Sequence, residues 1–449
     1  MRDPQGQLSF DGSRALRQLN PPHQIPTFLT HPLARQLVDA GLLVPFDIKA
    51  PDLIESPRYP FISLPTEWCD LQHSVAAELT LLLAERVLAA GFELKDASAW
   101  NVIFEGSAAR FCDHLSVAPV VTRQWWAFGQ FCRHFTFPLA CSHWRGMHTH
   151  ATFAAHRDGL GTSQARALLG LRGRLSRLAP LLLRAQGTAS ADSDFNPDNQ
   201  PVPAKPVAGA GGSLHPSLIK YCRHSLLSPR QAGAVAQPQT WSGYIAERPH
   251  YTEDALQTKL AQMAQWMAQL QPRTVLDLGC NTGEFSRLAL AQAGTQRVVA
   301  VDADHDCVQQ VFANAAGSTR LHALVANLGD MHGGRGWAAT EFTGLLDRLD
   351  GQSDLVLMLA LVHHLHFSEG IPLPRIAELA ARMSRRHLVV ELLDSDDPMV
   401  MRLAAQRRRE PDGFTIEQQL AAFGSHFELL ERLPLAGTRR VLALMRRRP

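Results

Sequence analysis

Five residues that could line a ligand site fall within two short stretches of the sequence. The stretch VLDLGCNTGEFS holds an acid, two spaced glycines and an asparagine between them, which are Asp277, Gly279, Gly283 and Asn281. Glycine allows a turn with positive φ and a close approach of the backbone to a ligand, and asparagine tolerates the same conformation. The stretch VVAVDAD ends a predicted strand at Asp302, whose carboxylate could accept both hydroxyls of a ribose. The pattern therefore predicts a site for a ligand that contains a nucleoside.

The spacing of these residues distinguishes two classes of nucleotide cofactor. Nicotinamide dinucleotides are bound by the pattern G-x-G-x-x-G, in which a helix N-terminus faces a pyrophosphate. Here the glycines follow the pattern G-x-x-x-G, and Asp277 stands on the strand before them. A carboxylate would repel a pyrophosphate, but it would attract the ammonium and sulfonium charges of S-adenosylmethionine. We therefore expect a methyltransferase rather than a dehydrogenase.

Both stretches resemble sequence motifs of class I S-adenosylmethionine-dependent methyltransferases, and the resemblance extends over roughly residues 241–446. It implies a role for each matching position. The positions implied to line the methionine end of the cofactor are Asp277, Gly279, Asn281 and Gly283. Asp302 would hold the ribose. Asn327, after the third strand, would lie near the adenine amine, where many relatives have aspartate.

Two adjacent histidines follow the most apolar stretch of the chain, DLVLMLALVHHL. In small-molecule methyltransferases a similar strand precedes His-His-Leu, and the resemblance implies that His363 or His364 faces the acceptor. A neutral imidazole could take a proton from the acceptor. In the alternative reading, one ring caps the strand end and the other points to solvent. Glu391 and Asp394, after the fifth strand, are further candidates for the cleft, or simply polar lining.

The elements that must position these residues alternate between strand and helix. Strands are predicted at 273–278, 297–301, 321–326, 354–361 and 387–393, and helices at 283–292, 306–315 and 374–383. Two last strands, at 427–433 and 440–445, are joined by a short turn and must pair antiparallel. The fold class is therefore α/β, a Rossmann-like doubly wound and mostly parallel sheet with a terminal antiparallel hairpin.

The composition describes a globular chain with one break. The 449 residues are 45% hydrophobic and 19% charged, and the formal net charge of +2 gives no field toward nucleic acid or membrane. The stretch 185–212 is rich in Pro, Gly, Ala, Ser and Asp and is typical of a flexible linker. It separates an expected N-terminal domain at 1–184 from an expected methyltransferase domain at 213–449.

The sequence lacks signals for a membrane span, for secretion and for a metal site, and this indicates the cellular compartment that we expect. No apolar run approaches the roughly 20 residues of a membrane helix, and the first residues lack the apolar segment of a secretion signal. The seven cysteines form no C-x-x-C pair, and the histidines between 143 and 156 have no acidic or cysteine partner at a metal spacing. We expect a cytoplasmic protein with no metal site and no membrane partner.

The N-terminal part carries a second pattern. After a predicted amphipathic helix at 75–90 come Asp96, Asn101 and, beyond a short hairpin, Asp113. This order resembles the catalytic loop and the metal-binding aspartate of kinase-like phosphotransferases, and it implies an α+β kinase-like domain. Because Leu94-Lys95 replaces His-Arg and no glycine-rich loop precedes, we expect an inactive domain used for docking or substrate recognition. The alternative is an unrelated helical domain in which Asp96 and Asn101 cap a turn.

The overall layout also resembles bacterial two-part methyltransferases of the nodulation type, beginning at Glu67-Trp68-Cys69. We expect a methyltransferase whose acceptor is a small molecule, with RNA and protein acceptors left open and the oligomeric state unspecified. Two alternatives stand beside it, a bifunctional kinase-methyltransferase and a non-catalytic S-adenosylmethionine-binding scaffold.

Overall fold

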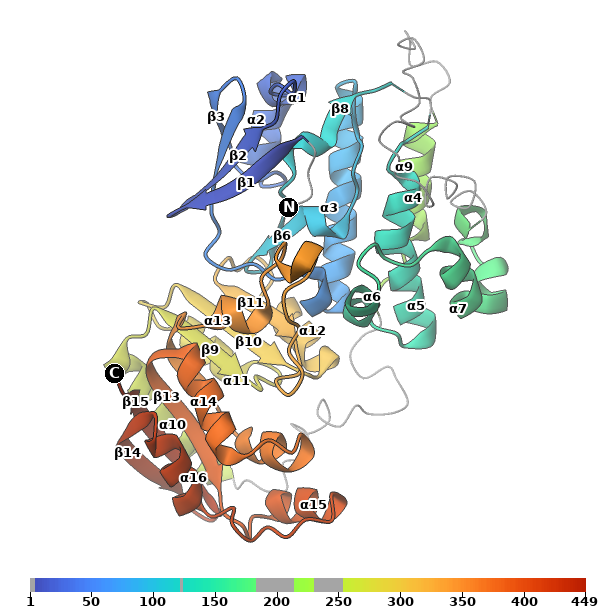
Figure 1. Ribbon diagram of the computed structural model, residues 1–449. Coiled ribbons are helices and arrows are strands. Elements are labelled where there is room, and N and C mark those ends of the chain that lie inside the picture. Colours follow the sequence, from blue (N-terminus) through green and yellow to red (C-terminus); the bar gives the residue numbers. More distant parts are fainter. Residues whose placement is uncertain (1–4, 122–123, 183–213, 230–252) are drawn as a thin grey trace. The chain divides into compact units, whose positions relative to one another are not determined.

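The computed structural model describes residues 5–121, 124–182, 214–229 and 253–449 (Figure 1). The chain divides into two compact units, Met1–Gln231 and Ala232–Pro449. Among the described residues, no helix is both long enough and apolar enough to cross a bilayer. The expected linker at 185–212 lies outside the described residues.

A seven-stranded sheet forms the centre of the C-terminal unit, in the order β11-β10-β9-β12-β13-β15-β14. The strands are β9 Thr274–Leu278, β10 Arg297–Asp302, β11 Leu321–Val325, β12 Ser353–Met358, β13 Ser384–Leu393, β14 Phe427–Leu435 and β15 Arg440–Arg447. The first five pair in parallel, whereas β15 pairs antiparallel with both β13 and β14. The predicted mostly parallel sheet with a terminal hairpin is confirmed.

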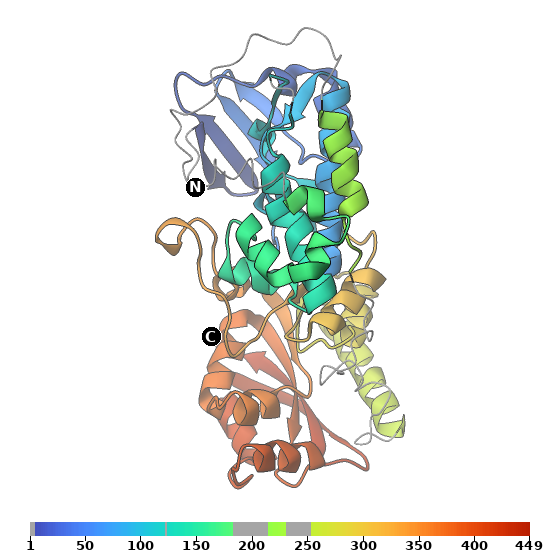
Figure 2. The same cartoon turned by 90° about the vertical axis from the view of Figure 1, so that its right-hand side faces the viewer.

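Helices cover both faces of this sheet. They are α10 Glu253–Leu270, α11 Glu284–Leu290, α12 His305–Asn314, α13 Leu345–Leu349, α14 Leu373–Met383, α15 Pro398–Gln406 and α16 Ile416–Gly424. Helices α10 and α11 lie on one face, and α14 and α16 lie on the other (Figures 1 and 2). Because both faces are covered, every residue of β12 is buried, as the apolar run in the sequence predicted.

The central strand β12 ends three residues before the predicted end at 361. Ala360 has a φ of 52°, a left-handed conformation that cannot continue a strand. The chain then turns into a short π-helical segment, His364–Ser368. Apolar composition alone could not reveal this turn, because Leu359 to Val362 are as apolar as the strand itself.

The N-terminal unit contains three small antiparallel sheets and a long helix. The largest sheet has the order β1-β2-β4-β3, and the others pair β5 with β8 and β6 with β7. The strands are β1 Gly6–Asp11, β2 Arg14–Leu19, β3 Asp47–Ala50, β4 Leu53–Pro57, β5 Phe92–Leu94, β6 Val102–Glu105, β7 Ala108–Phe111 and β8 Val117–Pro119. The described helices are α1 Thr27–Thr30, α2 Pro32–Asp39, α3 Asp70–Ala89, α4 Phe128–Phe131, α5 Phe137–Arg145, α6 Thr149–Ala155, α7 Thr162–Arg174 and α9 His215–Ser225.

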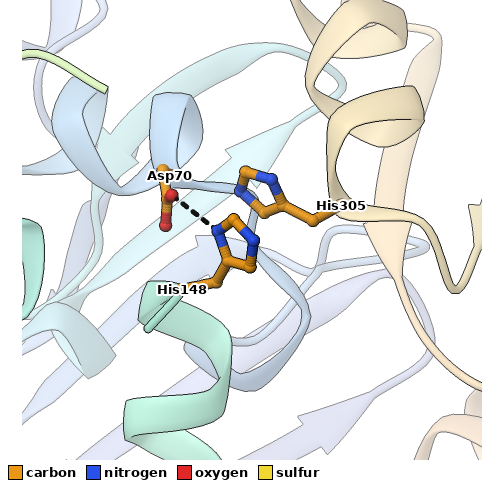
Figure 3. Close-up of side chains that lie close together, drawn as sticks. All are labelled: Asp70, His148 and His305. Carbon is orange, nitrogen blue, oxygen red and sulfur yellow. Dashed lines mark hydrogen bonds and ion pairs between the residues drawn. The ribbon is translucent and has the colours of Figure 1, made fainter. Parts of the chain in front are cut away.

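Helix α3 begins earlier than the predicted helix at 75–90 and is buried around most of its circumference, so it lacks the exposed polar face of the amphipathic helix that was expected. Its first residue, Asp70, accepts hydrogen bonds from the backbone N–H of Thr149 at 2.8 Å and from Nδ1 of His148 at 2.9 Å (Figure 3). The hydroxyl of Ser142 also donates to Asp70. The buried carboxylate therefore ties α5 and the start of α6 to the N-terminus of α3, where the helix dipole favours a negative charge.

Helix α9 corrects the expected start of the C-terminal domain at 213. Nε of Arg223 lies 3.1 Å from a carboxylate oxygen of Glu78, and Arg223 also pairs with Glu85, both on α3. The hydroxyl of Tyr221 donates to the carbonyl of Arg177 at 2.6 Å. These contacts place α9 in the N-terminal unit. The composition of the preceding stretch indicated a break, but it could not indicate on which side the next helix packs.

Candidate functional site

The loop after β9 adopts the backbone conformation that its residues predicted. Gly279, Asn281 and Gly283 have φ values of 72°, 48° and 79°. A Cβ atom on Gly283 would lie 2.8 Å from Cγ2 of Val311, so a side chain there would collide with α12. The backbone N–H of Gly279 donates to the carbonyl of Val301 at 2.8 Å, which holds the loop against the end of β10.

Asp302 lies at the end of β10 and faces this loop. One carboxylate oxygen accepts the backbone N–H of Asn281 at 2.7 Å, and the other accepts the N–H of Asp304 at 2.9 Å. Burial raises the pKa of Asp302, and these backbone donors oppose that effect. The half-buried carboxylate is thus fixed in place by two backbone contacts, and its remaining lone pairs could accept hydroxyl donors.

Asp277, which was expected to line the methionine end of the cofactor, points into the interior of the unit. Its side chain is buried, with only 2% of the residue exposed, and it accepts the hydroxyl of Ser286 at 2.6 Å. Burial raises the pKa of Asp277 to about 6, while the hydrogen bond from Ser286 lowers it. The carboxylate therefore connects β9 to α11 beneath the loop.

Asn327 follows β11 on the same edge of the sheet and is exposed. Its side-chain oxygen accepts the backbone N–H of Gly329 at 2.8 Å, which stabilises the turn after the strand. The N–H of Ala326 donates to the carbonyl of Asp302 at 2.9 Å. The ends of β9, β10 and β11 therefore bring their predicted residues to one edge, on one side of the point where the strand order reverses.

The two histidines follow β12, on the other side of that point. The ring centroids of His363 and His364 are 4.1 Å apart. Burial lowers the pKa of His363 well below its usual value and lowers that of His364 to about 4. Nδ1 of His363 has no hydrogen-bond partner among the residues that the structure describes. Both imidazoles are therefore neutral at physiological pH.

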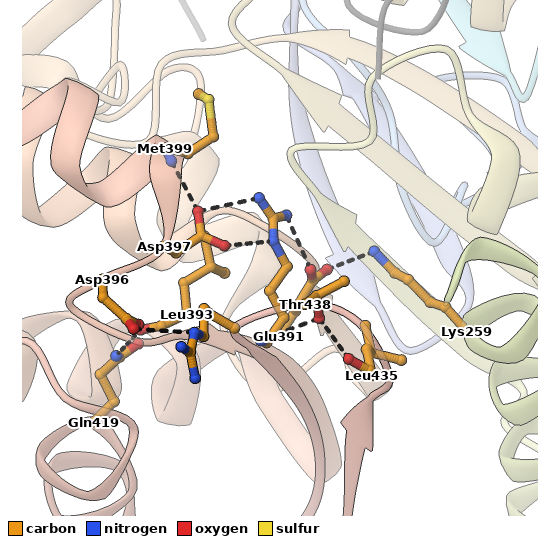
Figure 4. A network of polar contacts seen from close by, with 11 residues as sticks. Lys259, Glu391, Leu393, Asp396, Asp397, Met399, Gln419, Leu435 and Thr438 are labelled. Carbon is orange, nitrogen blue, oxygen red and sulfur yellow. Dashed lines mark hydrogen bonds and ion pairs between the residues drawn. The ribbon is translucent and has the colours of Figure 1, made fainter. Parts of the chain in front are cut away.

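Sequence reasoning missed three charged residues that gather around Glu391 at the end of β13: Lys259, Asp397 and Arg440 (Figure 4). They come from α10, from the N-cap of α15 and from β15. No spacing in the sequence links these segments. The cluster becomes visible only in the fold, where β15 pairs with β13 and the side chains from α10 and from the N-cap of α15 reach them. Asp394, the other candidate from this region, accepts the N–H of Ser395 at 2.8 Å.

In the N-terminal unit, Asp96, Asn101 and Asp113 lie near one another. Asp96 accepts the N–H of Ser98 at 3.0 Å and a hydrogen bond from the side chain of Asn101. Burial, followed by the charge of Asp113, raises the pKa of Asp96. Asp113 itself is paired with Arg17 of β2, whose Nη1 lies 3.1 Å from its carboxylate.

Comparisons with known proteins match part of the chain to a protein family and nearly the whole of it to one curated protein. Residues 248–428 match the family described as "Methyltransferase domain". The chain is 27% identical to the nodulation protein NoeA of Rhizobium meliloti (strain 1021), over 98% of this chain and 94% of that protein.

Among solved structures, the N-methyltransferase NodS from Bradyrhizobium japonicum WM9 is 12% identical, with a TM-score of 0.33, over 44% of this chain and 98% of that one. The bifunctional kinase-methyltransferase WbdD is 18% identical, with a TM-score of 0.31, over 43% of this chain and 40% of that one.

Proposed function

We propose that this chain, whose C-terminal half is a class I S-adenosylmethionine-dependent methyltransferase, transfers a methyl group to a small-molecule acceptor. The observation that carries the proposal is the distribution of residues about the reversal of strand order between β9 and β12. A glycine loop with a fixed carboxylate lies on one side, and a pair of neutral histidines, of which His363 is buried and His364 half-buried, lies on the other. Ligands of doubly wound sheets bind at such a reversal.

The residues on the β9 side fit S-adenosylmethionine, which supplies a methyl group on a positively charged sulfur. The positive φ values at Gly279, Asn281 and Gly283 keep the loop backbone open to close approach. Asp302 would accept the ribose hydroxyls, and Asn327 would lie near the adenine. Asp277 would act from beneath, by holding the loop through Ser286 and by contributing negative charge.

The residues on the β12 side would receive the acceptor. Holding acceptor and donor in line supplies most of the rate of a methyl transfer, and the enzyme needs no nucleophile of its own. An acceptor hydroxyl or amine must, however, lose a proton. His363 or His364 could take that proton, because both are neutral at physiological pH. The net charge of +2 favours a small acceptor over a long nucleic acid.

The cofactor site is tested by titrating S-adenosylhomocysteine into the whole protein in a calorimeter. Replacing Asp302 by Ala removes charge-assisted hydrogen bonds worth about 1.5–3 kcal/mol, so we expect binding about 10- to 100-fold weaker. Asp330→Ala is the matched control, because Asp330 is exposed on the same edge of the sheet. Unchanged affinity in Asp302→Ala would refute the site.

The acceptor class is tested by incubating the protein with methyl-labelled S-adenosylmethionine and a fractionated cell extract. We expect the label in the small-molecule fraction, and we expect the double change His363→Gln and His364→Gln to reduce it while S-adenosylhomocysteine still binds. Label in RNA or protein would contradict the small-molecule proposal. Cofactor binding without any transfer would favour the scaffold alternative.

For the N-terminal unit we propose a kinase-like shape without phosphoryl transfer. The proximity of Asp96, Asn101 and Asp113 favours the shape. Asp113, however, already accepts hydrogen bonds from Arg17, from the N–H of Leu115 and from the hydroxyl of Ser116. A carboxylate paired with a guanidinium is poorly suited to bind Mg²⁺. We therefore expect no magnesium-dependent ATP binding by calorimetry, and binding that Asp113→Ala abolishes would instead support the bifunctional alternative.

A further inference from the structure

Four charged side chains form a buried cluster at the carboxyl end of β13. Nζ of Lys259 lies 2.5 Å from one oxygen of Glu391, and Nη1 of Arg440 lies 3.3 Å from the other. Nε of Arg440 lies 2.9 Å from Asp397 (Figure 4). The side chains of Lys259, Glu391, Asp397 and Arg440 are 6%, 0%, 2% and 0% exposed. Cations and carboxylates alternate, so every charge has a partner of opposite sign.

A gain in folding stability does not explain why these four charged side chains are buried together. Desolvation of buried charges is costly, and apolar side chains of similar volume often serve a fold equally well. The cluster does fix geometry, however. Arg440 contacts Asp397 through both Nε and Nη2, at 2.9 and 3.3 Å, which restrains the guanidinium plane. Asp397 in turn accepts the N–H of Met399 at 2.9 Å and so caps α15.

The register of the sheet places this cluster beside the cofactor residues. Asp277 pairs with Leu357 and Leu357 with Val389, so Glu391, two residues further along β13, projects from the same face. Nζ of Lys259 bonds Glu391 and lies 4.8 Å from the ring centroid of Phe285, at the start of α11. The cluster is therefore continuous with the helix that follows the glycine loop.

The cluster also reaches the two histidines through α15, because Asp397 caps this helix and α15 packs against the segment His364–Ser368. Burial is the main cause of the low pKa of both rings. The positive charge of Arg440 lowers the pKa of His364 further, and together with His364 it lowers that of His363. An imidazolium beside this guanidinium is disfavoured, which keeps both rings neutral.

Other charged groups near the histidine turn have different partners. On α14, Arg375 pairs with Glu378. Arg409, after α15, donates to the carbonyl of His366 and lowers the pKa of that residue, whose main perturbation is burial. Arg440 is thus the cation whose charge acts on the pair.

We propose that Arg440, clamped by Asp397 and Glu391, is a positioning residue for methyl transfer that fixes the His363–His364 pair on the acceptor side of the site. The proposal rests on the function proposed above, in which these histidines receive the acceptor. Lys259 extends the same cluster to the cofactor side, so that donor and acceptor sides share one rigid support.

The test replaces Arg440 without leaving an unpaired buried charge. The double variant Arg440→Met/Asp397→Leu removes one cation and one carboxylate and leaves Lys259 paired with Glu391. In the whole protein, the histidine pKa values are followed by NMR of labelled imidazoles, with His363→Gln and His364→Gln for assignment. We expect both pKa values to rise, because the charge of Arg440 is removed. Label transfer into extract at pH 8 should fall several-fold, because the histidine pair is no longer held in place.

Two further measurements separate the possible outcomes. Binding of S-adenosylhomocysteine should be unchanged in the double variant. If the unaltered protein does not bind S-adenosylhomocysteine, the proposed function fails, and the role of Arg440 is then not what failed. The control Arg409→Met should raise the pKa of His366 and leave the pair unaffected. Unchanged pKa values of His363 and His364 in the double variant, or a rate of label transfer equal to that of the unaltered protein, would overturn the proposal.

If the double variant does not fold, Arg440→Lys answers the same question. Lysine keeps the charge but cannot make the paired contacts to Asp397. We expect the rate of label transfer to fall at least five-fold while the histidine pKa values stay low. A rate equal to that of the unaltered protein would show that the clamp has no positioning role.

Discussion

At the scale of single residues, ligand binding and burial have opposite effects on the charge of Asp277. The ligand expected at the loop favours a negative charge there, but the carboxylate is buried against α11 and has its pKa raised to about 6. In the folded protein the group therefore binds its proton more tightly than in the unfolded chain. The stability that this provides is present at low pH and is lost as the pH rises through 6. At neutral pH the charge is a cost to the fold.

Replacing Asp277 by Asn should therefore stabilise the protein at pH 8 and weaken its cofactor site. The amide still accepts the hydroxyl of Ser286, and the rise from 3.8 to about 6 corresponds to roughly 3 kcal/mol. Urea unfolding at pH 8 should show most of this gain, and the difference should shrink as the pH falls through 6. Asp330→Asn, at an exposed site, should change the free energy of unfolding by less than about 0.5 kcal/mol at either pH. A loss of stability at pH 8 would contradict the assignment.

Residue types alone predicted the conformation of the loop better than the direction of its side chains. The positive φ of Asn281 was expected from its position between the two glycines, because backbone preference is local. That Asp277 points to Ser286 depends on where α11 packs. The cluster around Arg440 depends on pairing between β13 and β15, whose residues are about fifty positions apart in the chain.

At the scale of elements, the strands of the C-terminal unit and its helices α11, α12 and α14 were predicted from apolar periodicity, whereas α10, α13, α15 and α16 were not. Strand β10 extends from Arg297 to Asp302, one residue beyond the prediction. Strand β13 begins at Ser384, three residues before the predicted start, directly after α14. Its first residues, Ser384 to Arg386, are polar and do not resemble a buried strand. Pairing with a neighbour, rather than composition, extends the strand there.

The packing of α12 against the loop gives a prediction at this scale. Gly283→Ala meets both a left-handed backbone and a contact of 2.8 Å to Val311, so we expect a loss of about 2–5 kcal/mol of unfolding free energy. Gly317→Ala is the matched control. Gly317 has a φ of 82° with no atom within 4 Å of the added Cβ, and should cost only about 1–2 kcal/mol.

The double variant Gly283→Ala/Val311→Ala separates the cost of the contact with Val311 from the cost of the left-handed backbone. Removing Cγ2 of Val311 relieves the collision, so the two changes together should destabilise less than the sum of the separate changes. Chemical denaturation of all four proteins completes the cycle. Strict additivity would mean that the loop and α12 move apart without cost, and that the packing does not hold the loop.

At the scale of the whole molecule, the chain consists of two compact units, and the boundary lies after α9 rather than before it. The ion pairs of Arg223 with Glu78 and Glu85 lie within the first unit. The composition of residues 185–212 predicted a break there, because proline and glycine act locally, but that stretch lies outside the described residues. It could not assign the following helix, since that assignment depends on residues about 140 positions earlier in the chain.

The second unit should therefore fold by itself. A fragment of residues 232–449 contains the complete seven-stranded sheet, helices on both of its faces and every residue assigned above to the cofactor, acceptor and positioning roles. We expect it to show one cooperative thermal transition by circular dichroism and to bind S-adenosylhomocysteine within about three-fold of the whole chain. A fragment starting at residue 213 should gain nothing, because α9 has its partners in the other unit. A fragment 232–449 that stays unfolded would show that the sheet needs the first unit for its stability. Cofactor binding without label transfer to the extract, where the whole chain transfers it, would instead assign acceptor recognition to residues 1–231.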